Sequence, residues 1–112
     1  MNSKINNVVI FGGTSVKALS IAREVVDASN RVILVDTDWS ALSLAVDILG
    51  NVEHPQHVVA IQADLKEERQ VEDLVSTICY KFGRADKVFD CQESNSAQYH
   101  LLERKLLSRF VA

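Results

Sequence analysis

Two adjacent glycines stand between the first apolar run of the chain and its first helical pattern. The segment reads Phe11-Gly12-Gly13-Thr14-Ser15, and the helical pattern follows directly. Backbone amides at the N-terminus of a helix attract anions, phosphate groups above all. Gly12, Gly13 and Ser15 are therefore candidate contacts to a phosphorylated ligand. A tight strand-to-helix turn with no ligand is the alternative.

Acidic residues close the second and third apolar runs. Asp36 ends the second run, and Asp64 with Leu65 follows the third. A carboxylate at the end of the second strand can accept hydrogen bonds from both hydroxyls of an adenosine ribose. Each acid also has a simpler role open to it. Asp36, like Asp38 and Ser40, could cap the second helix, and Asp64 could cap the third.

The elements that must position these residues alternate along the chain. Short apolar runs rich in β-branched residues, typical of parallel strands covered on both faces, occupy 8–11, 32–35, 58–63 and 88–91. Apolar residues at helical spacing occupy 18–26, 42–49, 71–82 and 96–110. Gly50 and Gly83 follow the second and third helical patterns, where a left-handed residue commonly ends a helix.

This alternation predicts an α/β fold with a three-layer, doubly wound parallel sheet. We expect about four strands in the order 3-2-1-4, with four helices on the two faces. The chain has 112 residues, too few for two separate cores, so residues 1–112 form one domain. Open sheets of this kind bind ligands at the carboxyl ends of their strands. The glycine turn and both acids are expected to meet at that edge.

Composition excludes several classes of protein. Hydrophobic residues make up 47% of the chain and charged residues 24%, which excludes disorder and a disulfide scaffold. The net charge is -3 and the basic residues are scattered, so we expect no nucleic-acid and no membrane partner. No apolar run approaches the ~20 residues of a membrane-spanning helix. The first residues lack the pattern of a secretory signal, and we expect a cytoplasmic protein.

The cysteines, histidines and tryptophan predict no catalytic or metal site. Cys79 and Cys91 each lie in an apolar pattern, and we expect both to be buried and reduced. His54 and His57 fall in a predicted loop without further ligands at metal-binding spacing, so no metal is expected. Trp39 could stack on an adenine at the ligand edge or cover the edge of the sheet.

The sequence resembles the short-chain dehydrogenase/reductase family from residue 5 to about residue 92. The matching segments, in order, are the glycine turn, the strand and acid at 32–36, the segment 63–65, and the string Lys-Phe-Gly-Arg-Ala-Asp at 81–86. The resemblance implies a Rossmann-like NAD(P)-binding domain. By this likeness Gly12, Ser15, Asp36, Asp64 and Leu65 contact the dinucleotide. It also implies NAD rather than NADP, because the Asp36 carboxylate repels a 2′-phosphate.

Two departures from the family pattern weaken the expected binding. The three glycines of the family's T-G-x-x-x-G-x-G align on Gly12, Val16 and Ala18, so two of them are replaced. Val16 brings a branched side chain to the place where the backbone approaches the pyrophosphate. After the fourth strand, Asp90 and Glu93 bring negative charge toward the far half of a dinucleotide.

The family's catalytic serine and Tyr-x-x-x-Lys pair have no counterpart in this sequence. Tyr99 is followed four residues later by Glu103, and Lys105 has the wrong spacing. We assign no catalytic residue and expect a non-catalytic domain that binds NAD or another adenine nucleotide weakly. An enzyme completed by a partner chain is an alternative. A phosphoacceptor receiver domain is a remote one, because glycines stand where a receiver has its metal-binding acids.

The last helical pattern favours self-association. Residues 93–112 carry more apolar side chains than one sheet face needs, and the strand at 88–91 ends the predicted sheet. Exposed apolar edges pair with other strands. We expect a homodimer formed through this strand, the C-terminal helix or both. The second functional hypothesis is accordingly a dimerising protein-interaction scaffold with a vestigial nucleotide cleft.

Overall fold

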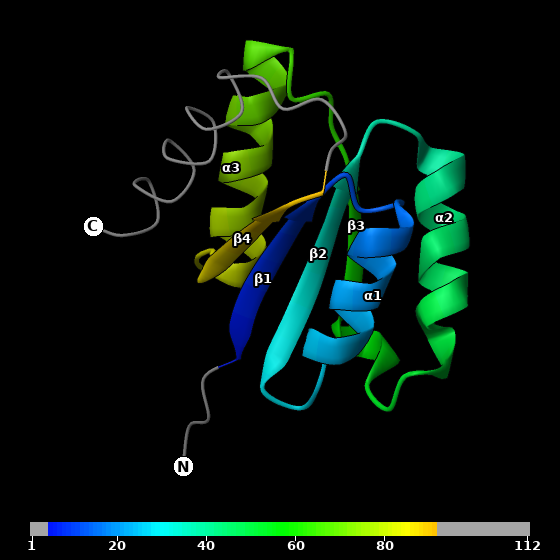
Figure 1. The fold of residues 1–112 in the computed structure, drawn as a ribbon. Helices are drawn as coiled ribbons and strands as arrows, with labels where there is room; N and C mark the ends of the chain where they lie inside the picture. The colour runs from blue at the N-terminus through cyan, green and yellow to red at the C-terminus, as the bar shows by residue number, and fades with distance from the viewer. Residues whose placement is uncertain (1–4, 92–112) are drawn as a thin grey trace.

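The computed structural model describes residues 5–91, which form a sheet with helices on both sides (Figure 1). The strands are β1 (Asn6–Phe11), β2 (Asn30–Asp36), β3 (Val58–Gln62) and β4 (Lys87–Asp90). The α-helices are α1 (Val16–Val25), α2 (Trp39–Ile48) and α3 (Glu68–Phe82). Two 3-10 helices, η1 (Leu49–Asn51) and η2 (Pro55–His57), lead from α2 to β3.

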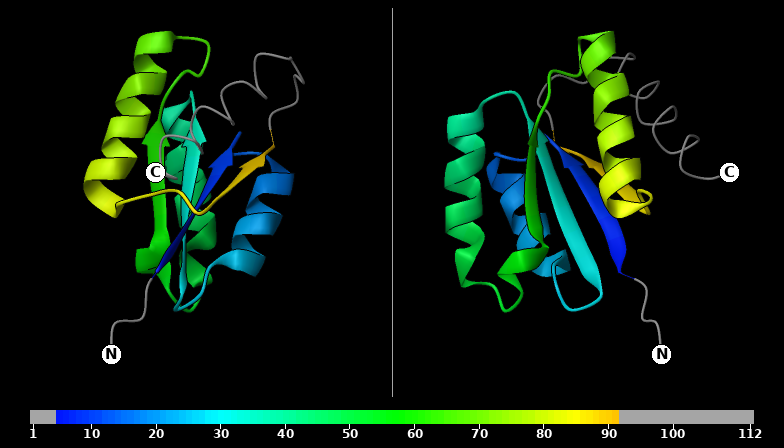
Figure 2. Two further views of the ribbon diagram at one scale, coloured as in Figure 1. Left: turned by 90° about the vertical axis from the view of Figure 1, so that its left-hand side faces the viewer. Right: turned by 180° about the vertical axis from the view of Figure 1, so that it is seen from behind.

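The sheet has the predicted order, β3-β2-β1-β4, and every neighbouring pair is parallel. Helices α1 and α2 step outward along the sheet toward β3, whereas α3 returns past β2 and β1 to β4. Because such crossovers are right-handed, the two directions place helices on opposite faces, and α3 lies across the sheet from α1 (Figure 2). The doubly wound fold is confirmed.

The helix count differs from the prediction. The described residues contain three α-helices, not four, and the helix expected at 96–110 lies outside those residues. Within residues 5–91 no helix is long and apolar enough to cross a membrane.

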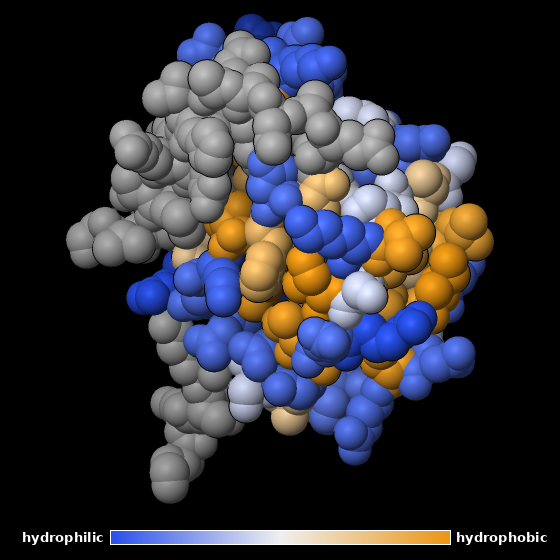
Figure 3. All heavy atoms as spheres, viewed as in Figure 1, coloured by the Kyte–Doolittle hydropathy of each residue, from blue (hydrophilic) through white to orange (hydrophobic). Residues whose placement is uncertain are grey.

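Consecutive residues of the central strands face two separate cores. The strand residues that pack with α3 are Val9, Phe11, Ile33 and Val35. Those that pack with α1 and α2 are Val8, Ile10, Val32 and Leu34. Burial on both faces explains why these strands are unbroken apolar runs rather than alternating patterns. On the α1 and α2 face, apolar residues also reach the surface between polar side chains (Figure 3).

Among the described residues one polar side chain is fully buried, that of Asn7, at the amino end of β1. Its amide nitrogen donates to the carbonyls of Phe82 at 3.0 Å and Arg84 at 2.8 Å. Its side-chain oxygen accepts a hydrogen bond from Arg31 at 2.9 Å. The Asn7 backbone N–H donates to the carboxylate of Asp86 at 2.8 Å. Asn7 therefore ties the loop between α3 and β4 to the centre of the sheet.

The predictions for Gly50 and Cys79 are wrong, whereas the corresponding predictions for Gly83 and Cys91 are confirmed. Gly50 does not end α2 in a left-handed conformation, because the chain continues into η1; in the described residues only Gly12 and Gly83 have positive φ. Gly83, with φ of 91°, ends α3 as predicted. Cys79 is exposed instead of buried, because it falls on the solvent side of α3. Cys91 is buried, and neither cysteine is in a disulfide.

Candidate functional site

The turn between β1 and α1 lies at the carboxyl edge of the sheet, and both glycines shape it. Gly12 has φ of 69°, a left-handed conformation that favours glycine. Gly13 lies against β2, where a Cβ atom added to it would come within 2.7 Å of the Leu34 Cβ. The Gly13 N–H donates to the Val35 carbonyl at 3.1 Å. The glycine pair thus brings the turn against β2.

Helix α1 starts at this edge with a capped first turn. Ser15 is the N-cap, and its Oγ accepts a hydrogen bond from the Ala18 N–H at 3.1 Å. The helical ladder starts with the N–H of Leu19, which donates to the Ser15 carbonyl at 3.0 Å. Because the Ala18 N–H is taken by the Ser15 side chain, the N–H groups of Val16 and Lys17 are the ones in this turn that can bind an anion. Val16 is 85% exposed, so a phosphate would reach these amides beside its branched side chain.

Asp36, at the end of β2, turns its carboxylate toward the glycine turn. Its Oδ2 accepts hydrogen bonds from the Thr14 N–H at 3.2 Å and from the Thr14 hydroxyl at 2.7 Å. Its Oδ1 accepts one from the Thr37 N–H at 2.8 Å. Asp36 does not cap α2, since Asp38 is the N-cap and accepts from amides of the first turn. The acid and the turn are therefore in direct contact at the carboxyl edge of the sheet.

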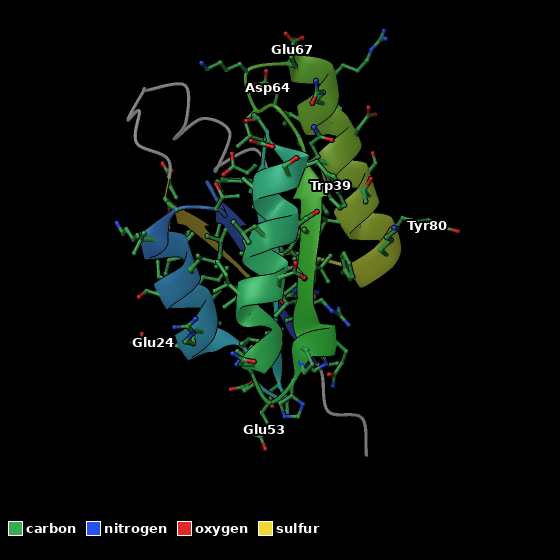
Figure 4. The ribbon with its side chains drawn as sticks, turned by 90° about the vertical axis from the view of Figure 1, so that its right-hand side faces the viewer. Glu24, Trp39, Glu53, Asp64, Glu67 and Tyr80 are labelled. Atoms are coloured by element: carbon green, nitrogen blue, oxygen red, sulfur yellow. The ribbon has the colours of Figure 1, made fainter. Side chains whose placement is uncertain are left out.

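Asp64 and Leu65 follow β3 next to the end of β2. The Ala63 N–H donates to the Asp36 carbonyl at 3.0 Å, which sets the following residues beside the site. Asp64 does not cap α3, because the N-cap is Glu67 (Figure 4). Leu65 is 7% exposed and packs in the core beneath α3. A ligand at the edge would therefore meet the backbone of Leu65 rather than its side chain.

Trp39, the first residue of α2, lies along β3. It is 53% exposed and, together with Val58 and Ala60, lines a shallow groove of 310 Å³ (Figure 4). This position fits a side chain that covers the edge of the sheet. It gives no support to the alternative that Trp39 stacks on an adenine.

The carboxyl edge of the sheet holds a buried thiol beyond the end of β4, that of Cys91. The Cys91 N–H donates to the Phe11 carbonyl at 2.9 Å, which continues the pairing of β1 beyond β4. Burial raises the pKa of the Cys91 thiol, the positive charge of Lys17 opposes this shift, and Asp90 adds to it. The thiol stays protonated at neutral pH and is a poor nucleophile.

Comparison with solved structures identifies the fold. A short-chain type dehydrogenase/reductase from Mycobacterium ulcerans matches with a TM-score of 0.71 and 20% identity, over 86% of this chain and 35% of that one. Levodione reductase matches with a TM-score of 0.76 and 19% identity, over 97% of this chain and 50% of that one. L-Sorbose reductase from Gluconobacter frateurii, complexed with NADPH and L-sorbose, matches with a TM-score of 0.67 and 22% identity. The match covers 98% of this chain and 48% of that one. This chain has the fold of the N-terminal half of short-chain dehydrogenases/reductases.

The chain spans half or less of the length of these structures, between 35% and 50%. No protein-family model matches the sequence, and a search of curated proteins gives no match. Likeness at this level of identity establishes the short-chain dehydrogenase fold and not an activity.

Within the short-chain dehydrogenase fold, the predicted contacts fall in two neighbouring groups. The glycine turn and Asp36 form the first, and residues 64–65 form the second. Sequence interpretation missed Thr14, which joins the turn to Asp36. Thr14 could have been found from the sequence, because it is a hydroxyl residue in a turn that was predicted to lie near Asp36. The family pattern leaves that position open, so the match gave it no role.

Proposed function

We propose that this chain is a non-catalytic domain of the short-chain-dehydrogenase type that binds NAD or another adenine nucleotide weakly. The observation that carries the proposal is the contact of Asp36 with the turn at the start of α1. That contact sets a carboxylate suited to ribose hydroxyls beside a helix N-terminus suited to phosphate. L-Sorbose reductase, which shares the fold, is complexed with NADPH.

Two features favour weak over tight binding. The Val16 side chain stands at the start of α1, where the family has a glycine that lets the backbone approach the pyrophosphate. Asp90, at the end of β4, adds negative charge on the side where the second half of a dinucleotide would lie. AMP lacks that second half and avoids the Asp90 side.

The proposal assigns binding without catalysis. The tyrosine within the described residues, Tyr80, is 91% exposed on α3, and the residue four positions later is Arg84 instead of lysine. Neither residue lies at the ligand edge, because α3 ends at the opposite end of the sheet. The free thiols of Cys79 and Cys91 suit a reducing compartment, and we propose the cytoplasm.

Nucleotide titration tests this proposal. We expect NAD and AMP to bind with dissociation constants on the order of 1 mM, and NADP to bind more weakly because Asp36 repels a 2′-phosphate. Asp36→Asn is expected to weaken NAD binding about tenfold, since a charged acceptor is lost. The same variant should lose most of the preference for NAD over NADP. Calorimetry or NMR chemical-shift titration measures both effects.

Asp38→Asn is the matched control for this experiment. It removes the same charge from the N-cap of α2, where asparagine serves as well as aspartate. We expect it to leave the affinity for NAD unchanged. An equal loss in both variants would contradict a direct role for Asp36. If NAD, NADP, ATP and AMP all fail to bind the wild-type chain at millimolar concentration, the proposal is wrong.

A dimerising interaction scaffold with a vestigial cleft is the second candidate, and the edge strand β4 favours it. β4 pairs with β1 on one side and has no second strand neighbour among residues 5–91. Two copies could continue the sheet through this edge, together with the C-terminal helix expected within 93–112. A dimer in light scattering at high micromolar concentration, without any nucleotide binding, would favour the scaffold. A monomer that binds NAD or AMP would exclude it.

A further inference from the structure

We infer that the Thr14 hydroxyl occupies the place on Asp36 that a ribose hydroxyl would take, so that Thr14 limits the affinity of the site. This inference rests on the proposed nucleotide binding and names the residue that controls it. Thr14 belongs to the turn that meets the phosphate, and Asp36 is the acid that meets the ribose. Because of their contact, the Thr14 hydroxyl competes with the ribose for Asp36.

The acceptor capacity of Asp36 carries the first step of the argument. A carboxylate has about four acceptor positions on its two oxygens. Three are filled here, two on Oδ2 by Thr14 and one on Oδ1 by the Thr37 N–H. A ribose presents two adjacent hydroxyls and needs two positions. One existing donor must therefore leave before both hydroxyls can bind.

The three donors differ in how easily they can leave. Two are backbone N–H groups, those of Thr14 and Thr37, which move only if the chain moves. The turn cannot retreat freely, because Gly13 packs against β2 and its N–H is bonded to the Val35 carbonyl. The Thr14 hydroxyl is released by rotation about a single side-chain bond. It is the donor that a ribose displaces.

The short contact makes this displacement costly. The distance of 2.7 Å from the Thr14 hydroxyl to Asp36 is typical of a strong hydrogen bond to an ionised group. Thr14 is only half-buried, so the freed hydroxyl can turn to water and the site has room to open. A nucleotide bound in this way gains its contact to Asp36 and loses the one already present. One ribose hydroxyl therefore replaces Thr14 with little net gain, and the other, on the open acceptor position of Asp36, supplies the gain in affinity.

Thr14→Val removes the hydroxyl and keeps the shape of the side chain. It therefore distinguishes competition of the hydroxyl with the ribose from an effect of side-chain packing. We expect Thr14→Val to bind AMP about tenfold more tightly than wild type, which is the worth of one displaced hydrogen bond to a charge. Thr14→Ser keeps the hydroxyl and is expected to bind AMP as wild type does. The decisive ligand is 2′,3′-dideoxy-AMP, which lacks both ribose hydroxyls and should gain nothing from Thr14→Val.

NMR titration of the three proteins with both ligands distinguishes the outcomes. If Thr14→Val gains equally for AMP and for the dideoxy ligand, the effect is general and the inference is overturned. Unchanged or weaker AMP binding by Thr14→Val, beside measurable binding by wild type, overturns it too, and the proposed function stands. If no protein binds either ligand, the proposed function fails together with the inference.

Discussion

Gly13→Ala is expected to lower the free energy of unfolding by about 3 kcal/mol, because the added methyl group overpacks the interface between the turn and β2. A Cβ atom at this position lies 2.7 Å from the Leu34 Cβ and 3.0 Å from both the Leu34 Cα and the Val35 nitrogen. Two of these neighbours are backbone atoms of a strand buried on both faces, so they cannot move aside cheaply. Urea denaturation followed by circular dichroism measures the loss.

Gly50→Ala is the matched control. Nothing lies within 4 Å of a Cβ atom at Gly50, and its φ is not positive. The same methyl group is therefore expected to change the free energy of unfolding by less than about 1 kcal/mol, toward greater stability. Equal losses in the two variants would show that the close approach of Gly13 to β2 is not what requires glycine there.

Asn7→Leu is expected to destabilise the domain by about 4 kcal/mol, because it keeps the size of the side chain and removes its hydrogen bonds. The carbonyls of Phe82 and Arg84 would lose their donor, and the Arg31 guanidinium would lose an acceptor. All three hydrogen bonds are part-buried, and each orphaned partner costs roughly 1 to 3 kcal/mol. Thermal and urea denaturation measure the change.

The neighbouring residue Asn6 provides the control for Asn7. Its side chain is half-buried and donates to Asn30 at 3.3 Å, a long hydrogen bond near solvent. Asn6→Leu is expected to cost less than about 1 kcal/mol. If Asn7→Leu is no more damaging than Asn6→Leu, the network around Asn7 does not hold the α3–β4 loop to the sheet.

The fold was predictable because its strands are buried on both faces. A run such as 32–35 has no polar alternation, and such runs separated by helical patterns leave few arrangements other than a doubly wound parallel sheet. The conformation at the ends of the helices was less predictable. Gly50 and Gly83 follow helices in the same way, but only Gly83 adopts the left-handed conformation, because at Gly50 the chain turns into η1.

That the glycine turn and Asp36 meet was predictable for a similar reason, since parallel strands bring their carboxyl ends to one edge. Asp36 and the glycine turn are neighbours there, as the strand order requires. The bond between Thr14 and Asp36 was not predictable, because it depends on a side-chain rotamer and on how far the turn leans toward β2. The same limit applies to Cys79, where a rotation of one position around α3 separates core from solvent.

The partners of Asn7 have a consequence for how the chain folds as it leaves the ribosome. Asn7 is synthesised well before its partners, because the carbonyls that accept hydrogen bonds from its side-chain amide belong to residues 75 and 77 positions later. Until those residues emerge, β1 can pair with β2, but the side-chain amide of Asn7 lacks the acceptors that it needs in the interior. Closing the sheet therefore waits for residues 82–84, and nascent chains that stop before Phe82 should be cleaved readily by proteases.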